Sequence, residues 1–332
     1  MQTELISPEM TNEPHQSDRS KQLRKLMGQS AIYIILLVLI VVASLISPVF
    51  LRARSITNLL RQASTLGIVS VGQTFVILTG SIDLSVASVM ALMSVLAANL
   101  MKGEDSLALP VALLCLGVAV IIGLVNGLMI TKLRIPAFIA TLGTILIVQG
   151  IRFVYTGGAP KGSIPEALRF WGRGALGPIP TAVIIWVVII IAAVVILRQT
   201  TLGRRIYAVG GNPHTAHLSG VNVHGVIIAS HVICSFLAGV AGLVLTAYIG
   251  LADNWLGRGF ELDSIATVVV GGTALQGGKG SVLGSVAGVL IITILFNLVL
   301  QLNLDEETQR IVKGIVIIAA LALYVRLRPQ ES

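Results

Sequence analysis

The chain has 332 residues, of which 55% are hydrophobic and only 11% are charged, and its mean hydropathy is +0.91. Soluble domains carry about a quarter charged residues, so this composition excludes that class and indicates an integral membrane protein. The net charge is +8 at pH 7, but the 23 Lys and Arg are scattered between apolar runs, which favours lipid headgroups over a nucleic-acid partner.

Ten apolar runs follow one another along the chain, and each is a candidate membrane span. A spanning helix needs about 20 apolar residues, and helices satisfy their own backbone groups in lipid. The second, third and eighth runs are short or interrupted and are candidates for broken segments. We predict an all-α integral membrane protein with about ten transmembrane helices. The runs lie near residues 31–50, 64–80, 84–101, 108–131, 136–156, 180–197, 225–250, 262–276, 281–302 and 310–326.

The first 28 residues are polar and lack periodicity, so they are predicted to be a disordered cytoplasmic tail. A basic cluster precedes the first run, which places the amino terminus inside. Ten spans then return the carboxyl terminus to the cytoplasm, and the inside loops carry slightly more Lys and Arg than the outside loops. We predict a single transmembrane domain over residues 29–328 and a short cytoplasmic tail over residues 329–332.

Asp83 lies between two runs so close together that little aqueous loop separates them. An ionisable group at this depth is costly, and it normally faces a wet cavity or a partner inside the bundle. One interpretation is a polar hinge beside a transport pathway. The other is a helix cap, in which Asp83 or Ser81 accepts backbone N–H bonds at the start of the third helix. The two roles are compatible.

Several uncharged polar side chains also fall inside apolar runs, and hydrogen bonding between helices is their default role. The same groups are able to bind a sugar hydroxyl. Glycines repeat at every fourth residue in two runs, a spacing that favours close helix packing. The polar residues are Gln73, Asn126, Gln149 and Asn297, and the glycines are Gly123 with Gly127 and Gly280 with Gly284 and Gly288.

The segment 198–224 is the one long polar insert between two apolar runs. Turns are expected at Gly203 and over Gly210–Pro213, followed by a short helix that closes at Gly220. Such an insert in a membrane protein has the character of a docking surface for a soluble partner. Arg204 and Arg205 are able to bond acidic groups of that partner, or alternatively lipid headgroups.

Other candidate chemistry is rejected on spacing. The glycine-rich segment 271–281 fails the phosphate-loop pattern because Gly280 rather than Ser or Thr follows Lys279, so it is interpreted as a second, smaller cytoplasmic contact. His214, His217, His224 and His231 lack nearby carboxylates or cysteines and are interpreted as surface and helix-end histidines, so no metal is expected. Both cysteines lie in apolar runs, which excludes a disulfide framework.

Several separated motifs together resemble the ribose-type permease subunits of ATP-binding-cassette importers, over residues 31–326. Ser81 and Ala87 stand where many relatives carry glycine, which leaves the identity of the sugar open. The motifs are Thr79–Val86, Asn126–Gly127, Pro136–Thr144, Gly203–Arg204 with Tyr207–Gly210, and Gly271–Ser281.

The resemblance implies a multi-pass permease of the bacterial inner membrane that is not itself an enzyme and needs no cofactor. It implies a pair of identical or sister permeases, a periplasmic sugar-binding protein and a cytoplasmic ATPase subunit that binds ATP. The sugar would cross by alternating access, driven through the insert. The implied pathway residues are Ser81, Asp83, Ser85, Asn126, Gln149 and Asp263, and the implied coupling residues are Gly203, Arg204, Arg205, Tyr207, Gly210 and Asn212.

Two other functions fit the same sequence. An ion-coupled secondary transporter would use Asp83 and Asp263 as its ion-binding acids, although the long insert has no purpose in that scheme. A membrane scaffold without transport is a further alternative. Within the importer class, an autoinducer or inositol could replace the sugar.

Overall fold

The computed structural model describes residues 18–47 and 49–301, together with isolated positions between 305 and 318. Its long elements are helices, and β1 (Ala175–Leu176) and β2 (Ile179–Pro180) form a short antiparallel hairpin. The helices are α1 (Asp18–Ile46), α2 (Ala53–Leu78), α3 (Val86–Met101), the 3-10 turn η1 (Asp105–Leu107), α4 (Ala108–Thr131), α5 (Ala137–Thr156), α6 (Glu166–Arg173), α7 (Thr181–Gln199), α8 (Thr201–Gly211), α9 (Pro213–Leu218), α10 (Val223–Ile249), α11 (Phe260–Val270) and α12 (Val282–Gln301).

The predicted all-α membrane fold is confirmed. Among the described residues, five helical stretches are long and apolar enough to cross a membrane by length and composition, and two shorter apolar helices, Ile32–Ile46 and Val86–Met101, accompany them. The predicted tenth span and the tail after it lie almost wholly outside the described residues. The five stretches are Asp105–Thr131, Ala137–Thr156, Thr181–Gln199, Val223–Ile249 and Val282–Leu300.

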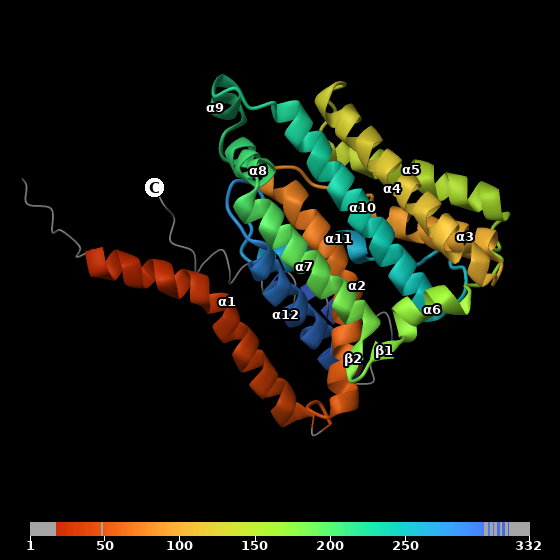
Figure 1. The fold of residues 1–332 in the computed structure, drawn as a ribbon. Helices are drawn as coiled ribbons and strands as arrows, with labels where there is room; N and C mark the ends of the chain where they lie inside the picture. The colour runs from red at the N-terminus through yellow and green to blue at the C-terminus, as the bar shows by residue number, and fades with distance from the viewer. Residues whose placement is uncertain are drawn as a thin grey trace, which may run out of the picture.

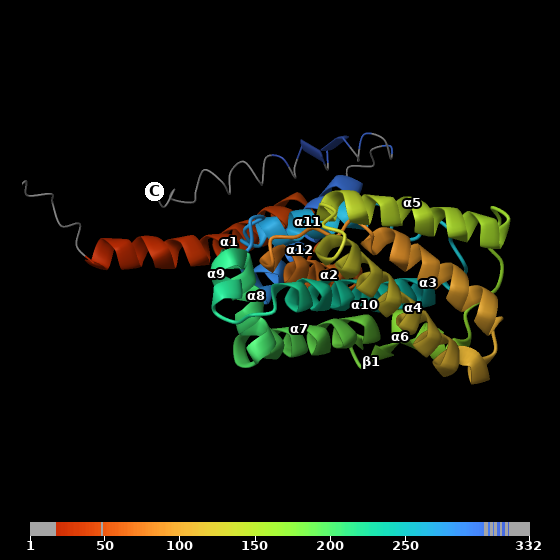
Figure 2. The same ribbon diagram turned by 90° about the horizontal axis from the view of Figure 1, so that it is seen from above.

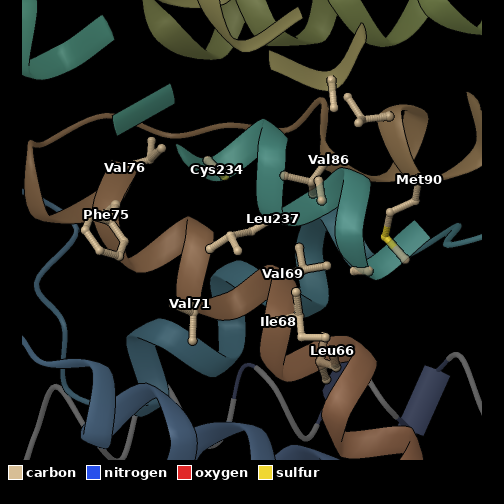
Figure 3. Close-up of a cluster of buried hydrophobic side chains, with 14 of the residues drawn as sticks. Leu66, Ile68, Val69, Val71, Phe75, Val76, Val86, Met90, Cys234 and Leu237 are labelled. Carbon is tan, nitrogen blue, oxygen red and sulfur yellow. The ribbon is translucent and has the colours of Figure 1, made fainter. Parts of the chain in front are cut away.

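The core is built around α2 and α10. Every residue of α2 from Ala63 to Leu78 is buried, which is expected of a helix that has small or apolar residues on all sides. α10 packs against α2, α3 and α4. Figure 3 shows the contact, where Val69 and Phe75 of α2 lie near Leu237 of α10. In Figure 2 the two helices lie between α7 on one side and α5 and α11 on the other.

Glycines allow the helices to approach closely, as their repetition at every fourth residue predicts. A Cβ at Gly127 of α4 would lie 2.7 Å from the Ile228 Cα of α10, and a Cβ at Gly123 would lie 2.6 Å from the His231 carbonyl oxygen. A Cβ at Gly288 of α12 would likewise overlap the backbone of α11 at Thr267. These positions are therefore packing contacts, in which a side chain would separate the two backbones.

The element boundaries correct the expectations in three places. α1 begins at Asp18, so residues 18–28 continue the first helix instead of forming part of a disordered tail, while residues 1–17 lie outside the described part. The run at 262–276 is helical only to Val270, because α11 ends there and residues 271–281 form a loop. The second run, which seemed interrupted, lies within the 26-residue helix α2.

Two polar stretches interrupt the apolar helices, and they lie in different parts of the bundle. α8 and α9 lie together at one end, and α6 with the β1–β2 hairpin lies at the other (Figure 1). Between α2 and α3 the chain leaves the helical conformation over residues 79–85. We call this stretch, Thr79–Ser85, the break, and we call residues 198–224 the docking segment.

Candidate functional site

The break places Asp83 against a histidine of α10. His231 Nδ1 lies 3.2 Å from Asp83 Oδ2, and His231 Nε2 lies 2.9 Å from Ser81 Oγ. Because a carboxylate only accepts hydrogen bonds, the ring nitrogen facing it carries the proton, and in the neutral ring Nε2 then accepts from the Ser81 hydroxyl. One histidine thus holds two residues of the break. Asp83 and His231 are both completely buried.

A chain of hydrogen bonds continues from Asp83 into α4 and α5. Asp83 Oδ1 accepts from the Ser85 hydroxyl at 2.6 Å and from the Ser85 N–H at 2.8 Å. Asn126 Nδ2 of α4 donates to Ser85 Oγ at 2.9 Å, and Thr144 Oγ1 of α5 donates to Asn126 Oδ1 at 2.6 Å. The network therefore links α10, the break, α4 and α5 through side chains alone.

Gln73 of α2 fixes the backbone of the same stretch. Its amide is assigned in the orientation in which Nε2 donates to the Asp83 carbonyl oxygen at 3.1 Å and Oε1 accepts from the Asp83 N–H at 3.2 Å. The side chain thereby replaces the backbone partner that Asp83 would have in a helix. A non-helical peptide is tolerated at membrane depth because protein groups satisfy it.

The network is closed in this conformation. Gln73, Asp83, Ser85, Asn126 and His231 are each 0% exposed, and they bond one another. A polar group that is buried and paired in this way is not available to a substrate until its partners separate. The arrangement can therefore stabilise one conformation of the bundle and can expose hydroxyl, amide and carboxylate groups in another.

Two sequence-based interpretations of these residues need correction. His231 is neither a surface nor a helix-end residue, since it lies within α10 and is fully buried. The helix-cap interpretation is right about the bond and wrong about the position, because Asp83 accepts the Ser85 N–H directly before α3 but the N-cap residue is Ser85, whose side chain makes no cap bond. Thr144 was not singled out either. A histidine inside an otherwise apolar run was the signal that could have identified His231.

The other two predicted pathway residues, Gln149 and Asp263, lie on α5 and α11, outside the chain of hydrogen bonds described above. Gln149 is half-buried on α5, one to two turns beyond Thr144. Asp263 lies in the first turn of α11, where its N–H donates to the Gly259 carbonyl oxygen. The structure therefore brings together Ser81, Asp83, Ser85 and Asn126 of the predicted set, and it adds Gln73, Thr144 and His231.

The docking segment is shaped by three consecutive helix caps. Thr200 Oγ1 accepts from the Gly203 N–H at 3.3 Å at the start of α8. Asn212 Oδ1 accepts from the Thr215 N–H at 3.0 Å at the start of α9, where Pro213 occupies the first turn. Asn222 Oδ1 accepts from the Gly225 N–H at 3.0 Å at the start of α10. Each cap begins a helix, and Thr200 and Asn212 are also the C-caps of the preceding helices, so the polar insert folds into the helix pair α8 and α9.

The predicted coupling residues divide between two faces of this helix pair. Arg204, Arg205 and Asn212 are exposed, while Gly203 and Gly210 are buried against the bundle. The expected turn at Gly203 is wrong, because Gly203 is helical within α8. The chain does turn within Gly210–Pro213, but at Asn212, since Gly210 and Gly211 are the last helical residues of α8. A groove beside α9 opens next to the exposed face. It is lined by Pro213, His214, His217, Gly220, Val221, Asn222, Val223 and His224.

Tyr207 connects the inner face of α8 to the loop that precedes α12. Its hydroxyl donates to the Gly280 carbonyl oxygen at 2.9 Å. Partial burial raises the pKa of Tyr207 above its ordinary value, and the nearby Arg198 opposes this shift. The phenol therefore keeps the proton that it donates. The loop 271–281 thus lies against the docking segment, at the same end of the bundle.

The described residues include no group of three or more His, Cys, Asp or Glu side chains that could hold a metal ion. Cys115 and Cys234 are both buried free thiols, on α4 and α10. The polar residues of the break are hydrogen-bonding groups, and those of the docking segment form a helical surface.

Comparison with known proteins places these features in a family. Residues 55–321 match the family model described as branched-chain amino acid transport system / permease component. The chain is 41% identical over 301 residues to the ribose import permease protein RbsC of Escherichia coli strain K12. The aligned residues cover 89% of this chain and 93% of that protein.

Two further relatives extend the similarity. The ribose import permease protein RbsC of Bacillus subtilis strain 168 is 40% identical over 293 residues, covering 87% of this chain and 90% of the relative. The galactose/methyl galactoside import permease protein MglC of Escherichia coli strain K12 is 34% identical over 315 residues, covering 90% of this chain and 94% of the relative. No solved structure matches the chain.

Proposed function

We propose that this chain, which belongs to the branched-chain amino acid transport system / permease component family, is the permease subunit of an ATP-binding-cassette importer for a small neutral sugar. Ribose or a closely related monosaccharide is the proposed cargo. The observation that carries the proposal is the 41% identity to a ribose import permease over 89% of this chain. It is a multi-pass membrane protein, and we place it in the bacterial inner membrane.

The break supports a sugar as cargo. Ser81, Ser85 and Asn126 offer neutral donors and acceptors, and Asp83 offers carboxylate oxygens that accept from Ser85 and from the His231 ring. Sugar hydroxyls both donate and accept hydrogen bonds, so they can replace the bonds that these side chains make to one another. Gln149 and Asp263 would line the same route. A hydrophobic or strongly charged solute would leave the polar groups unpaired, at a cost in free energy.

The closed network supports alternating access. Since Asp83 and its partners are buried and mutually bonded, a sugar reaches them only after α10, α4 and the break move apart. A ligand can drive such a movement only if it binds one of the two conformations more tightly than the other. In the proposed importer, that ligand is ATP, which a separate cytoplasmic ATPase subunit binds and hydrolyses.

The docking segment supports the partner assignment. Its exposed face carries Arg204, Arg205 and Asn212, and two exposed guanidinium groups can make charge-assisted hydrogen bonds to acidic groups of the ATPase. Gly203, Gly210 and Tyr207 lie on the face of α8 that contacts the bundle, and they would set the angle of the docking segment. A periplasmic sugar-binding protein and a second permease, identical or paralogous, complete the proposed assembly.

Uptake by the reconstituted complex tests the function. Proteoliposomes that contain this permease, its ATPase subunit and its sugar-binding protein are expected to accumulate labelled ribose only when ATP is supplied. Competition by unlabelled galactose, inositol and an autoinducer would identify the cargo within this class. Uptake by this chain alone, driven by a proton or sodium gradient without ATPase, would overturn the importer assignment in favour of a secondary transporter.

A further inference from the structure

The inner face of α8 meets the end of α2 at a contact between backbones. Gly210 lies so close to α2 and to the loop 271–281 that a Cβ there would overlap the Leu78 carbonyl oxygen and the Gly278 amide nitrogen. The Gly278 N–H donates to the same Leu78 carbonyl oxygen at 3.0 Å. Three chain segments therefore converge at one peptide group, with no side chain between them.

The loop side of this contact is built from further glycines. A Cβ at Gly277 would lie 2.9 Å from Gly210 Cα and 2.7 Å from the Gly80 amide nitrogen. Gly277 has a φ of +90°, a left-handed conformation that favours glycine. The hydrogen bond from Tyr207 to Gly280 holds the same loop to α8. The docking segment, the loop and the end of α2 are thus fixed to one another.

The end of α2 is joined directly to the break. The Ser81 N–H donates to the Val76 carbonyl oxygen at 3.2 Å, so the first residues of the break are folded back onto the last turn of α2. Asp83 follows Leu78 by five residues, which span at most about 18 Å even when the chain is extended. A displacement of Leu78 is therefore transmitted through a short, bonded stretch to Ser81 and Asp83.

The proposal rests on the proposed importer function and goes beyond it. We infer that Gly210 is a positioning residue, through which movement of the docking segment is transmitted to the break and separates the Asp83–His231 network. Because its contact with Leu78 is between backbones, it leaves no flexible side chain to absorb a small movement. A side chain at this position would separate α8 from α2 and weaken that transmission, while the exposed face that meets the ATPase stays unchanged.

The neighbouring residue gives a matched control. Gly211 is in the same helix, and a Cβ there would meet nothing within 4 Å. Gly210→Ala and Gly211→Ala therefore add the same methyl group and the same helix propensity, one at the contact and one in open space. Both variants are prepared as the complete complex with ATPase and sugar-binding protein, and the amount of co-purified ATPase reports assembly.

The expected readout is the number of sugar molecules imported per ATP hydrolysed. For Gly210→Ala we expect this ratio to fall about fivefold or more with ATPase still bound, and for Gly211→Ala we expect the ratio of the unmodified complex. Equal ratios for the two variants in assembled complexes would overturn the inference. Failure of the unmodified complex to import sugar with ATP would instead refute the proposed function, so the two failures are distinguishable.

A second measurement covers the case in which Gly210→Ala does not assemble. Hydrogen exchange of the peptide that contains Thr79–Ser85 is followed in the unmodified complex, with and without a non-hydrolysable ATP analogue. Faster exchange across the break when the analogue binds the ATPase is the expected result. Unchanged exchange there, while the docking segment itself changes, would contradict transmission through Gly210.

Discussion

The break and the docking segment are both polar interruptions between apolar helices, yet they satisfy their polar groups in opposite ways. In the break, Asp83 and His231 are buried and each is bonded to residues distant in the sequence. In the docking segment, Thr200 and Asn212 bond within three residues and Arg204 stays exposed. The comparison indicates that the first region depends on the whole bundle, whereas the helices of the second are capped locally and its exposed face is available to a partner.

The sharpest test of this difference is to remove a partner from the buried region. His231→Leu leaves the Asp83 carboxylate without its ring N–H in a site that excludes water. We expect the free energy of unfolding to fall by about 3 to 5 kcal/mol, measured by titrating the purified protein with a denaturing detergent. His224→Ala, an exposed histidine of the same helix, is the control and should have little effect. Equal losses for the two variants would remove the distinction.

A milder change in the break separates transport from assembly. Asp83→Asn keeps an acceptor for the Ser85 N–H but loses the charge that faces His231. We expect normal co-purification of ATPase and a lower maximal rate of sugar uptake, since charge-assisted bonds contribute about 1.5 to 3 kcal/mol. Unaltered uptake kinetics would reduce Asp83 to a replaceable turn residue.

The docking segment should show the reverse pattern. Arg204→Glu reverses an exposed charge that we propose to contact acidic groups of the ATPase. We expect the amount of co-purified ATPase to fall about tenfold, with the permease still folded. Arg54→Glu changes an exposed arginine at the start of α2, before the buried part of that helix, and should retain the ATPase. Retention of the ATPase by Arg204→Glu would argue for contact with lipid headgroups.

The smallest effect is expected at the cap between α8 and α9. Asn212→Ala removes the bond to the Thr215 N–H and should weaken α9 by about 1 kcal/mol. Hydrogen exchange of the peptide over 212–218 should therefore accelerate, while that of α10 stays unchanged. Slower or equal exchange at α9 would show that packing, rather than the cap, holds this short helix.

Local sequence signals predict the apolar helices and the start of α9 in the docking segment. Apolar runs mark the helices because lipid demands them, and Asn212–Pro213 marks the start of α9 because both residues act locally. Asp83 was identifiable as a buried acid for the same reason. These features need no knowledge of distant contacts.

The rest depends on contacts between distant segments. His231 pairs with a residue 148 positions away, so spacing with other histidines gave no indication of its role. The sequence predicts turns at Gly203 and Gly210, because sequence alone does not separate a glycine that bends a chain from one that lets two backbones touch. Thr144 bonds Asn126 only because α5 packs beside α4 in the folded chain, and the local sequence does not show this packing.

The side of the membrane that the docking segment faces tests the account most directly. Single cysteines are introduced as His217→Cys on α9 and as Lys161→Cys in the connection between α5 and α6, both at exposed positions in a chain whose native thiols are buried. With a membrane-impermeant maleimide, we predict that the first is labelled only in inside-out vesicles and the second only in right-side-out vesicles. Labelling of His217→Cys in right-side-out vesicles would contradict docking of a cytoplasmic ATPase on this segment.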